Sequence, residues 1–216
     1  SKRKEHIKKY FFSNRFYENI IKNKKDKRII KEFSKLKKYQ KKIKFVYQNK
    51  PKGTGDAILK CQKYLKGNYF LMLLPDDLII NKNCSKEMII LHKKKKSSII
   101  ATKTVKKKTV SRWGILSYKN KSKDFFEITD VVEKPNIKDA PSNYAIIGRY
   151  ILSTKIIKEI KNLKPSVGNE IHVTDAIKNM IKKGEKFHAN IFKGKYLDCG
   201  TLEGYIKSGL EIAKGK

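Results

Sequence analysis

The chain has 216 residues, of which 39% are hydrophobic and 10% aromatic, enough apolar material for one folded domain with a substantial core. Lys and Arg number 53 against 20 Asp and Glu, so the formal net charge is +33. The longest apolar run, residues 70–74, is far shorter than the roughly 20 residues of a membrane-spanning helix. These figures exclude a disordered chain and favour a soluble, cytoplasmic protein.

The positive charge is carried mainly by lysine, because only five of the 53 cationic residues are arginines. A basic surface attracts nucleic acids through their phosphates. Proteins that read bases depend on arginine, whose planar fork makes paired hydrogen bonds. We therefore interpret the lysines as solvated surface residues of a protein from an AT-rich genome. Nucleic-acid binding stays as an alternative.

The cysteines and histidines form no recognisable metal or disulfide pattern. The three cysteines are odd in number and widely spaced, and no C-x-x-C or H-x-x-x-H motif occurs. We expect these side chains to pack or to face solvent, in a reducing compartment.

The first part of the chain is predicted to contain helices and short strands. Apolar residues at helical spacing predict two helices, or one broken near Asn23, over residues 16–40. Residues 43–47 are typical of a short strand, and the G-T-G sequence at 53–55 leads into a helix over 56–65. The continuous apolar run 69–74 predicts a buried parallel strand that ends in a loop at Pro75-Asp76-Asp77.

Helices and strands alternate through the rest of the chain. Helices are predicted at 84–93, 153–162, 173–183 and 201–213, and strands at 97–105, 114–118, 125–133, 143–151, 187–192 and 195–198. We expect Thr174 or Asp175 to cap the third of these helices. The alternation predicts an α/β fold: a Rossmann-like mixed, mostly parallel sheet with helices on both faces, in a single domain over 1–216.

Three carboxylates follow predicted strands. Asp76 and Asp77 come directly after the most hydrophobic strand, and Asp198 follows Lys195-Tyr196-Leu197. Ligands of open α/β sheets bind beyond the carboxyl ends of the strands. Two carboxylates at neighbouring strand ends are suited to holding one Mg²⁺ together with water and phosphate oxygens. The alternative is that Asp76 and Asp77 cap a loop or the next helix.

Two further segments are candidates for substrate binding. Glu133-Lys134-Pro135 ends a predicted strand, where a carboxylate suits sugar hydroxyls and a lysine suits a phosphate. A surface ion pair followed by a turn is the alternative. The G-T-G turn at 53–55 would present backbone amides to an anion or a base, although it is neither a P-loop nor a G-x-G-x-x-G motif.

Taken in order, these segments resemble the bacterial UTP–glucose-1-phosphate uridylyltransferases, within the sugar nucleotidyltransferase superfamily. The resemblance runs along essentially the whole chain. The motifs that carry it are G-T-G-D-A-I, L-L-P-D-D-L-I, W-G-I, V-E-K-P, A-P-S-N-Y-A-I-I-G-R-Y, K-P-S-V-G-N-E-I-H-V-T-D-A-I and Y-L-D-C-G-T-L-E-G-Y.

The resemblance implies the nucleotide-diphospho-sugar transferase fold and Mg²⁺-dependent uridylyl transfer from UTP to glucose 1-phosphate, giving UDP-glucose and pyrophosphate. By this match Asp76 and Asp198 are the metal ligands, and Asp77 stands beside them near the sugar. Asp76 and Lys134 are the catalytic residues. The family also implies a homo-oligomer, a dimer or a tetramer, for the full-length protein.

The same match implies how the substrates are bound. Gln48 faces the edge of the uracil, and Gly53 lets the backbone approach the base. Gly114 lies under the glucose, Glu133 binds ring hydroxyls and Lys134 contacts the sugar phosphate.

The chain departs from the family pattern in three places. Asp56 stands where a His is usual, and Trp113 stands where a Tyr is usual. The family's N-terminal strand and glycine-rich loop, G-x-G-T-R with a later P-x-x-K, are missing. We therefore expect the chain to be the C-terminal three quarters of a full enzyme. Thymidylyl transfer and non-catalytic binding of UDP-glucose are the further alternatives.

Overall fold

The computed structural model describes residues 4–12, 18, 19, 21, 23 and 27–215. The chain divides into two compact units, residues 1–52 and residues 53–216, and each is described by itself. Within the described residues, no helix is long and apolar enough to cross a membrane. The expectation of a single domain stays a prediction.

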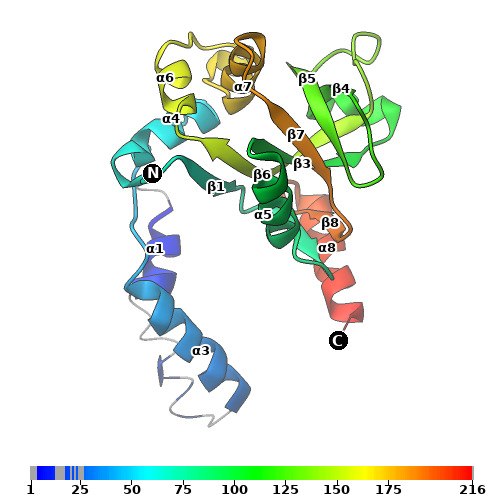
Figure 1. The fold of residues 1–216 in the computed structure, drawn as a ribbon. Helices are drawn as coiled ribbons and strands as arrows, with labels where there is room; N and C mark the ends of the chain where they lie inside the picture. The colour runs from blue at the N-terminus through cyan, green and yellow to red at the C-terminus, as the bar shows by residue number, and fades with distance from the viewer. Residues whose placement is uncertain (1–3, 13–17, 20, 22, 24–26, 216) are drawn as a thin grey trace. The chain divides into compact units, whose positions relative to one another are not determined.

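In the first unit, two helices are described: α1 (Glu5–Phe12) and α3 (Lys27–Gln40) (Figure 1). The predicted helix is confirmed over 27–40, whereas residues 16, 17, 20, 22 and 24–26 lie outside the described residues. The predicted strand at 43–47 is wrong, because these residues belong to no helix or strand. Extended backbone becomes a strand only beside a hydrogen-bonding neighbour, and none of the described strands pairs with this segment.

The second unit follows the predicted alternation closely. Its elements are α4 (Gly53–Cys61), η2 (Gln62–Tyr64), β1 (Tyr69–Leu73), β2 (Asp77–Ile80), α5 (Cys84–Lys95), β3 (Ser98–Thr104), η3 (Lys107–Arg112), β4 (Gly114–Lys119), β5 (Phe125–Glu133), β6 (Tyr144–Ser153), α6 (Ile156–Lys161), η4 (Val167–Asn169), α7 (Val173–Lys182), β7 (Phe187–Ile191), β8 (Lys195–Asp198) and α8 (Leu202–Lys214).

The main sheet has six strands in the order β1-β6-β3-β7-β5-β4, and β2 pairs with β8 in a separate two-stranded sheet. The mixed α/β fold is confirmed, but a mostly parallel sheet is wrong: among the described pairings only β3 with β7 is parallel. The mostly hydrophobic sequence of β6 reflects burial on both faces of the sheet, since nine of its ten residues are buried. Burial makes a strand continuously hydrophobic whatever its direction, so the sequence does not reveal the antiparallel pairing.

Strand β1 is a second case in which the sequence does not reveal the strand direction. The strand itself is confirmed, but its described partner is β6, which runs antiparallel to it. Its burial alternates, with Leu71 and Leu73 exposed on one face while Phe70 and Met72 pack against the core on the other. Asp77 opens strand β2 instead of lying in the predicted loop.

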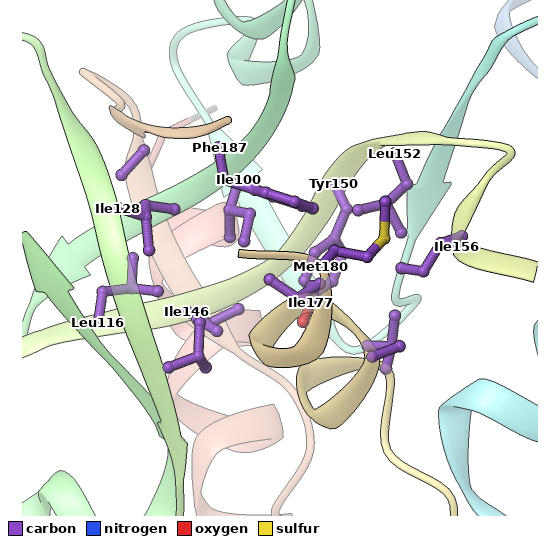
Figure 2. Close-up of a cluster of buried hydrophobic side chains, with 14 of the residues drawn as sticks. Ile100, Leu116, Ile128, Ile146, Tyr150, Leu152, Ile156, Ile177, Met180 and Phe187 are labelled. Carbon is purple, nitrogen blue, oxygen red and sulfur yellow. The ribbon is translucent and has the colours of Figure 1, made fainter. Parts of the chain in front are cut away.

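Helices cover both faces of the main sheet. On one face, α4, α6 and α7 pack over Ile100, Leu152 and Phe187 (Figure 2). On the other face, α5 packs through Met88 and Leu91 against strand residues that include Ile99 and Ile151. Neighbouring residues of one strand, such as Ile99 and Ile100, thus serve opposite cores. Full burial of a side chain of this size stabilises the folded state by about 1.5–3 kcal/mol. The helices packed on the two faces of the sheet therefore hold in place the strand ends from which the pocket is built.

Candidate active site

A pocket of about 280 Å³ lies within the second unit. It is lined by residues at the ends of β1, β4, β5 and β8, by residues of β6 and by the start of α7. Five of the predicted site residues line it: Asp76, Asp77, Gly114, Glu133 and Asp198. Tertiary structure therefore brings together positions up to 122 residues apart in the chain.

The first part of the pocket, here called the acidic end, consists of Asp76, Asp77 and Asp198. A Cβ placed on Gly200 would lie 3.2 Å from Oδ2 of Asp76 and 3.3 Å from Oδ1 of Asp198. Two carboxylates thus border the same small space, which the missing side chain of Gly200 leaves open. The backbone amide of Cys199 donates to the carbonyl oxygen of Asp76 at 2.8 Å, and this bond fixes the two segments against each other.

Asp77 is held on both carboxylate oxygens by groups of the protein. The backbone amide of Gly148 donates to Oδ2 at 2.7 Å, and the hydroxyl of Tyr196 donates to Oδ1. Burial raises the pKa of Asp77, and the charges of Asp76 and Asp198 raise it further, which outweighs the lowering by the two hydrogen bonds. Asp77 therefore links β2 to β6 and β8 at the floor of the acidic end.

Arg112 brings positive charge to the acidic end. Its guanidinium lies 3.2 Å from Oδ2 of Asp198, at the point where η3 leads into β4. Arg112 is a residue that the sequence reasoning missed, because its partner is 86 positions away. Its place directly before the W-G-I motif was the available signal.

The other part of the pocket, here called the Glu133 end, consists of Gly114, Glu133 and Thr174. Gly114 and Glu133 lie directly opposite each other in the β4–β5 ladder. A Cβ on Gly114 would lie 3.1 Å from Oε2 of Glu133 and 3.4 Å from Cγ2 of Thr174. The hydroxyl of Thr174 donates to the same Oε2 at 2.9 Å. The absence of a side chain at 114 thus leaves a hollow beside the carboxylate.

Helix α7 begins at this end of the pocket. Its N-cap residue is His172, whose side chain makes no capping bond, so the predicted cap at Thr174 or Asp175 is wrong. The hydroxyl of Thr54 instead accepts from the backbone amide of Val173 at 3.1 Å. A residue distant in sequence thus performs the capping role, leaving Thr174 for Glu133.

Gly53 has a packing reason to be glycine. Its φ is +92°, a backbone conformation that residues with a side chain rarely adopt. A Cβ at this position would also lie 2.5 Å from the carbonyl oxygen of Ile171. The neighbouring amide of Gly55 donates to that same carbonyl at 2.8 Å. The start of α4 is therefore pressed against the segment that enters α7.

Three of the predicted site residues, Lys134, Gln48 and Gly53, are not among those lining the pocket. Lys134 is exposed just after β5, with a φ of +46° and its amide donating to the carbonyl of Trp113 at 3.0 Å. Gln48 belongs to the other unit. The roles expected for these two residues, and for Gly53 at the base, stay predictions.

The family assignment rests on a match along nearly the whole chain. The family model described as "Nucleotidyl transferase" matches residues 5–215. The chain belongs to the nucleotidyl transferase family.

Named relatives of this nucleotidyl transferase family member are uridylyltransferases. UTP–glucose-1-phosphate uridylyltransferase 2 of Streptococcus pyogenes is 36% identical over 175 residues, which are 78% of this chain and 58% of the relative. UTP–glucose-1-phosphate uridylyltransferase of Pseudomonas aeruginosa is 36% identical over 167 residues, which are 76% of this chain and 60% of the relative. The chain thus spans about 60% of the length of these curated relatives.

Solved structures agree with the fold. A UDP-glucose pyrophosphorylase complexed with UDP-glucose is 34% identical, with a TM-score of 0.84 over 99% of this chain and 78% of that one. A UTP-bound enzyme from Acinetobacter baumannii is 28% identical, with a TM-score of 0.75 over 96% of this chain and 72% of that one. The nucleotide-diphospho-sugar transferase fold is therefore confirmed.

The acidic end has the donor chemistry of a magnesium site in this nucleotidyl transferase chain. Mg²⁺ is usually bound through one or two carboxylates, with water and phosphate oxygens completing an octahedron. Asp76 and Asp198 offer such a pair around the open space at Gly200. Among the described residues, no group of three or more His, Cys, Asp or Glu side chains is placed to hold a metal. The two carboxylates fit a cation whose remaining ligands come from substrate and water.

Proposed function

We propose that the chain carries out uridylyl transfer from UTP to glucose 1-phosphate, giving UDP-glucose and pyrophosphate. The observation that supports this most is the pocket itself, with a carboxylate pair at one end and a glutamate beside a glycine at the other. The similarity to a UDP-glucose pyrophosphorylase complexed with UDP-glucose points to the same substrates.

At the acidic end, Asp76 and Asp198 would hold Mg²⁺. When bound, Mg²⁺ neutralises phosphate oxygens and stabilises the charge that builds up during phosphoryl transfer. Arg112, 3.2 Å from Asp198, adds a second positive charge close to where the phosphates would lie. Asp77 contributes by holding β2, and thereby the adjacent Asp76, in place through Gly148 and Tyr196.

At the Glu133 end, the carboxylate of Glu133 would accept hydrogen bonds from ring hydroxyls of the glucose. Gly114 would let the sugar lie against the strand, because a side chain there would fill the hollow beside Oε2. We assign Lys134 to the sugar phosphate, and Gln48 and Gly53 to the uracil.

In the chemical step, a phosphate oxygen of glucose 1-phosphate attacks the α-phosphorus of UTP as the bond to pyrophosphate breaks. Since the attacking oxygen is already ionised, the chain's contribution is positioning and charge stabilisation.

The decisive experiment measures UDP-glucose formation by the 216-residue chain from UTP, glucose 1-phosphate and Mg²⁺, together with binding of UDP-glucose by calorimetry. We expect Asp76→Asn and Asp198→Asn to lower the rate of product formation on the order of 100-fold while the protein stays folded. The matched control is Asp130→Asn, since Asp130 lies on β5 outside the pocket and pairs with Lys178. Full activity of Asp76→Asn would contradict the metal assignment.

Further measurements separate uridylyl transfer from the alternative functions. Replacing UTP by dTTP under identical conditions distinguishes uridylyl from thymidylyl transfer. Binding of UDP-glucose without product would leave a binding protein, and failure to bind it would contradict the proposed function. The Mg²⁺ requirement is tested by adding a chelator. A nucleic-acid-binding protein would instead show affinity for DNA or RNA that falls steeply with salt.

A further inference from the structure

We propose that Thr174 is a positioning residue for the sugar: its hydroxyl fixes the carboxylate of Glu133 in the orientation that accepts the ring hydroxyls. This inference rests on the proposed function and deepens it, because it names a residue that determines how the sugar is recognised. Neither the sequence pattern nor the resemblance assigned a ligand-related role to Thr174.

The contacts around Glu133 support this role. The Thr174 hydroxyl donates to Oε2 at 2.9 Å, and the Cβ site of Gly114 lies 3.1 Å from the same oxygen. That oxygen is therefore confined between a hydroxyl donor from α7 and the backbone of β4. Thr174 is only 6% exposed, so its hydroxyl is directed into the protein, toward Glu133.

A glutamate on a strand needs such a contact to be well oriented. The terminal torsion of a Glu side chain is broad, so the carboxylate rotates easily when nothing holds it. A carboxylate also has about four acceptor sites, and Thr174 uses one of them. The remaining acceptor sites then stay available, in a fixed plane, for hydroxyls of a ligand.

Thr174 is itself held firmly. It occupies the first turn of α7, where the preceding amide, that of Val173, donates to the Thr54 hydroxyl at 3.1 Å. Threonine is branched at Cβ, and this restricts its first torsion more than that of serine. The helix N-terminus also favours an acidic group close to it, which suits the position of the Glu133 side chain. These features make the Thr174–Glu133 pair a rigid support.

The test compares binding of UDP-glucose with binding of UDP by calorimetry, using the full 216-residue chain. Thr174→Val keeps the shape but removes the hydroxyl, and we expect affinity for UDP-glucose to fall about 10-fold while affinity for UDP is unchanged. Thr174→Ser restores the donor and should recover most of the loss. The matched control is Thr102→Val, because Thr102 is also buried and donates to a backbone carbonyl, at 2.8 Å, away from the pocket.

A double-mutant cycle with Glu133→Gln shows whether Thr174 influences UDP-glucose affinity through the carboxylate of Glu133. If Thr174 acts through the carboxylate, adding Thr174→Val to Glu133→Gln should change UDP-glucose affinity much less than it does in the parent chain. Equal affinities of Thr174→Val and the parent for UDP-glucose would overturn the inference while leaving the proposed function intact. An equal loss for UDP and UDP-glucose would also overturn it, as it would show a general structural role. Failure of the parent chain to bind UDP-glucose would instead remove the proposed function, and this inference with it.

Discussion

At the Glu133 end of the pocket, the groups that would meet a ligand are placed by one strand ladder and one helix start. At the acidic end, the three carboxylates of Asp76, Asp77 and Asp198 lie on the two-stranded sheet of β2 and β8 and on the segment that precedes β2. The Glu133 end holds one carboxylate, with a hydroxyl donor beside it. The acidic end contains two carboxylates bordering one space and a third, Asp77, whose pKa is raised by burial and by the other two.

This difference shows what each end is suited to bind. A single oriented carboxylate with a hollow beside it suits neutral hydroxyl donors. Crowded carboxylates repel each other, so a cation entering the acidic end would relieve that repulsion as well as gain ligands. The protein offsets part of the repulsion itself, through Tyr196, the amide of Gly148 and Arg112.

The largest expected effect on stability comes from Gly148→Ala, which disturbs the contacts that hold the acidic end in place. A Cβ on Gly148 would overlap Oδ2 of Asp77 and would lie 2.5 Å from Cβ of Leu74, so Gly148→Ala forces backbone movement. We expect a loss of about 3 kcal/mol in the free energy of unfolding, measured by urea titration. Gly209→Ala is the control, because its Cβ meets nothing within 4 Å. Unchanged stability of Gly148→Ala would show that the acidic end tolerates displacement of β2.

A smaller effect is expected from removing the hydroxyl that supports Asp77. Tyr196→Phe leaves one oxygen of a partly buried carboxylate without this donor, and the expected cost is about 2 kcal/mol. The pKa of Asp77 should also rise further, since the hydrogen bond from Tyr196 lowers it. Tyr205→Phe, at an exposed position on α8, is the control in the same urea titration. Equal stabilities of the two variants would contradict the supporting role of Tyr196.

The pH dependence of stability sharpens the comparison further. The pKa of Asp77 is raised above the value in the unfolded chain, so the folded protein binds a proton at a pH where the unfolded chain does not. This contribution to stability is fully present below the unfolded pKa and is lost as pH rises through the folded pKa. We expect Asp77→Asn to flatten the dependence in that window, seen in urea titrations from pH 3.5 upward. The same slope in both proteins would contradict the raised pKa.

The smallest effect on stability is expected at the exposed Arg112–Asp198 pair. Ion pairs of this kind contribute about 0–1 kcal/mol, so Arg112→Gln should unfold at nearly the same urea concentration as the parent. Affinity for Mn²⁺, followed by electron paramagnetic resonance, should rise a few-fold, because Asp198 no longer has a competing cation. Weaker Mn²⁺ binding would show that the acidic end does not hold the cation through Asp198.

The sequence predicted the second unit well and the first unit less well. Strong local patterns, such as the run over 125–133 and the helical spacing over 173–183, became β5 and α7 with small shifts at their ends. The segment 43–47 has the composition of a strand but lacks a pairing partner among the described strands. Strand formation depends on a neighbour, which local sequence does not specify.

The residues of the candidate site also divide into those that the sequence predicted and those that it did not. Strand-end position and the resemblance singled out Asp76, Asp198, Gly114 and Glu133, all of which line one pocket. The supporting residues Thr174, Tyr196 and Arg112 were missed, because each acts through a partner at least 41 positions away.

The sequence by itself determined the order and type of most elements in residues 53–216, the family and the residue types gathered at the pocket. Tertiary structure decided the strand directions, the pairing of β2 with β8 and the hydrogen bonds that fix Asp77 and Glu133. The physical reason lies in the range of the forces. Hydrophobic periodicity is set by which face of an element is buried and is written into neighbouring residues. Strand direction, close approach at glycine and the partner of a carboxylate depend on segments that meet only after folding.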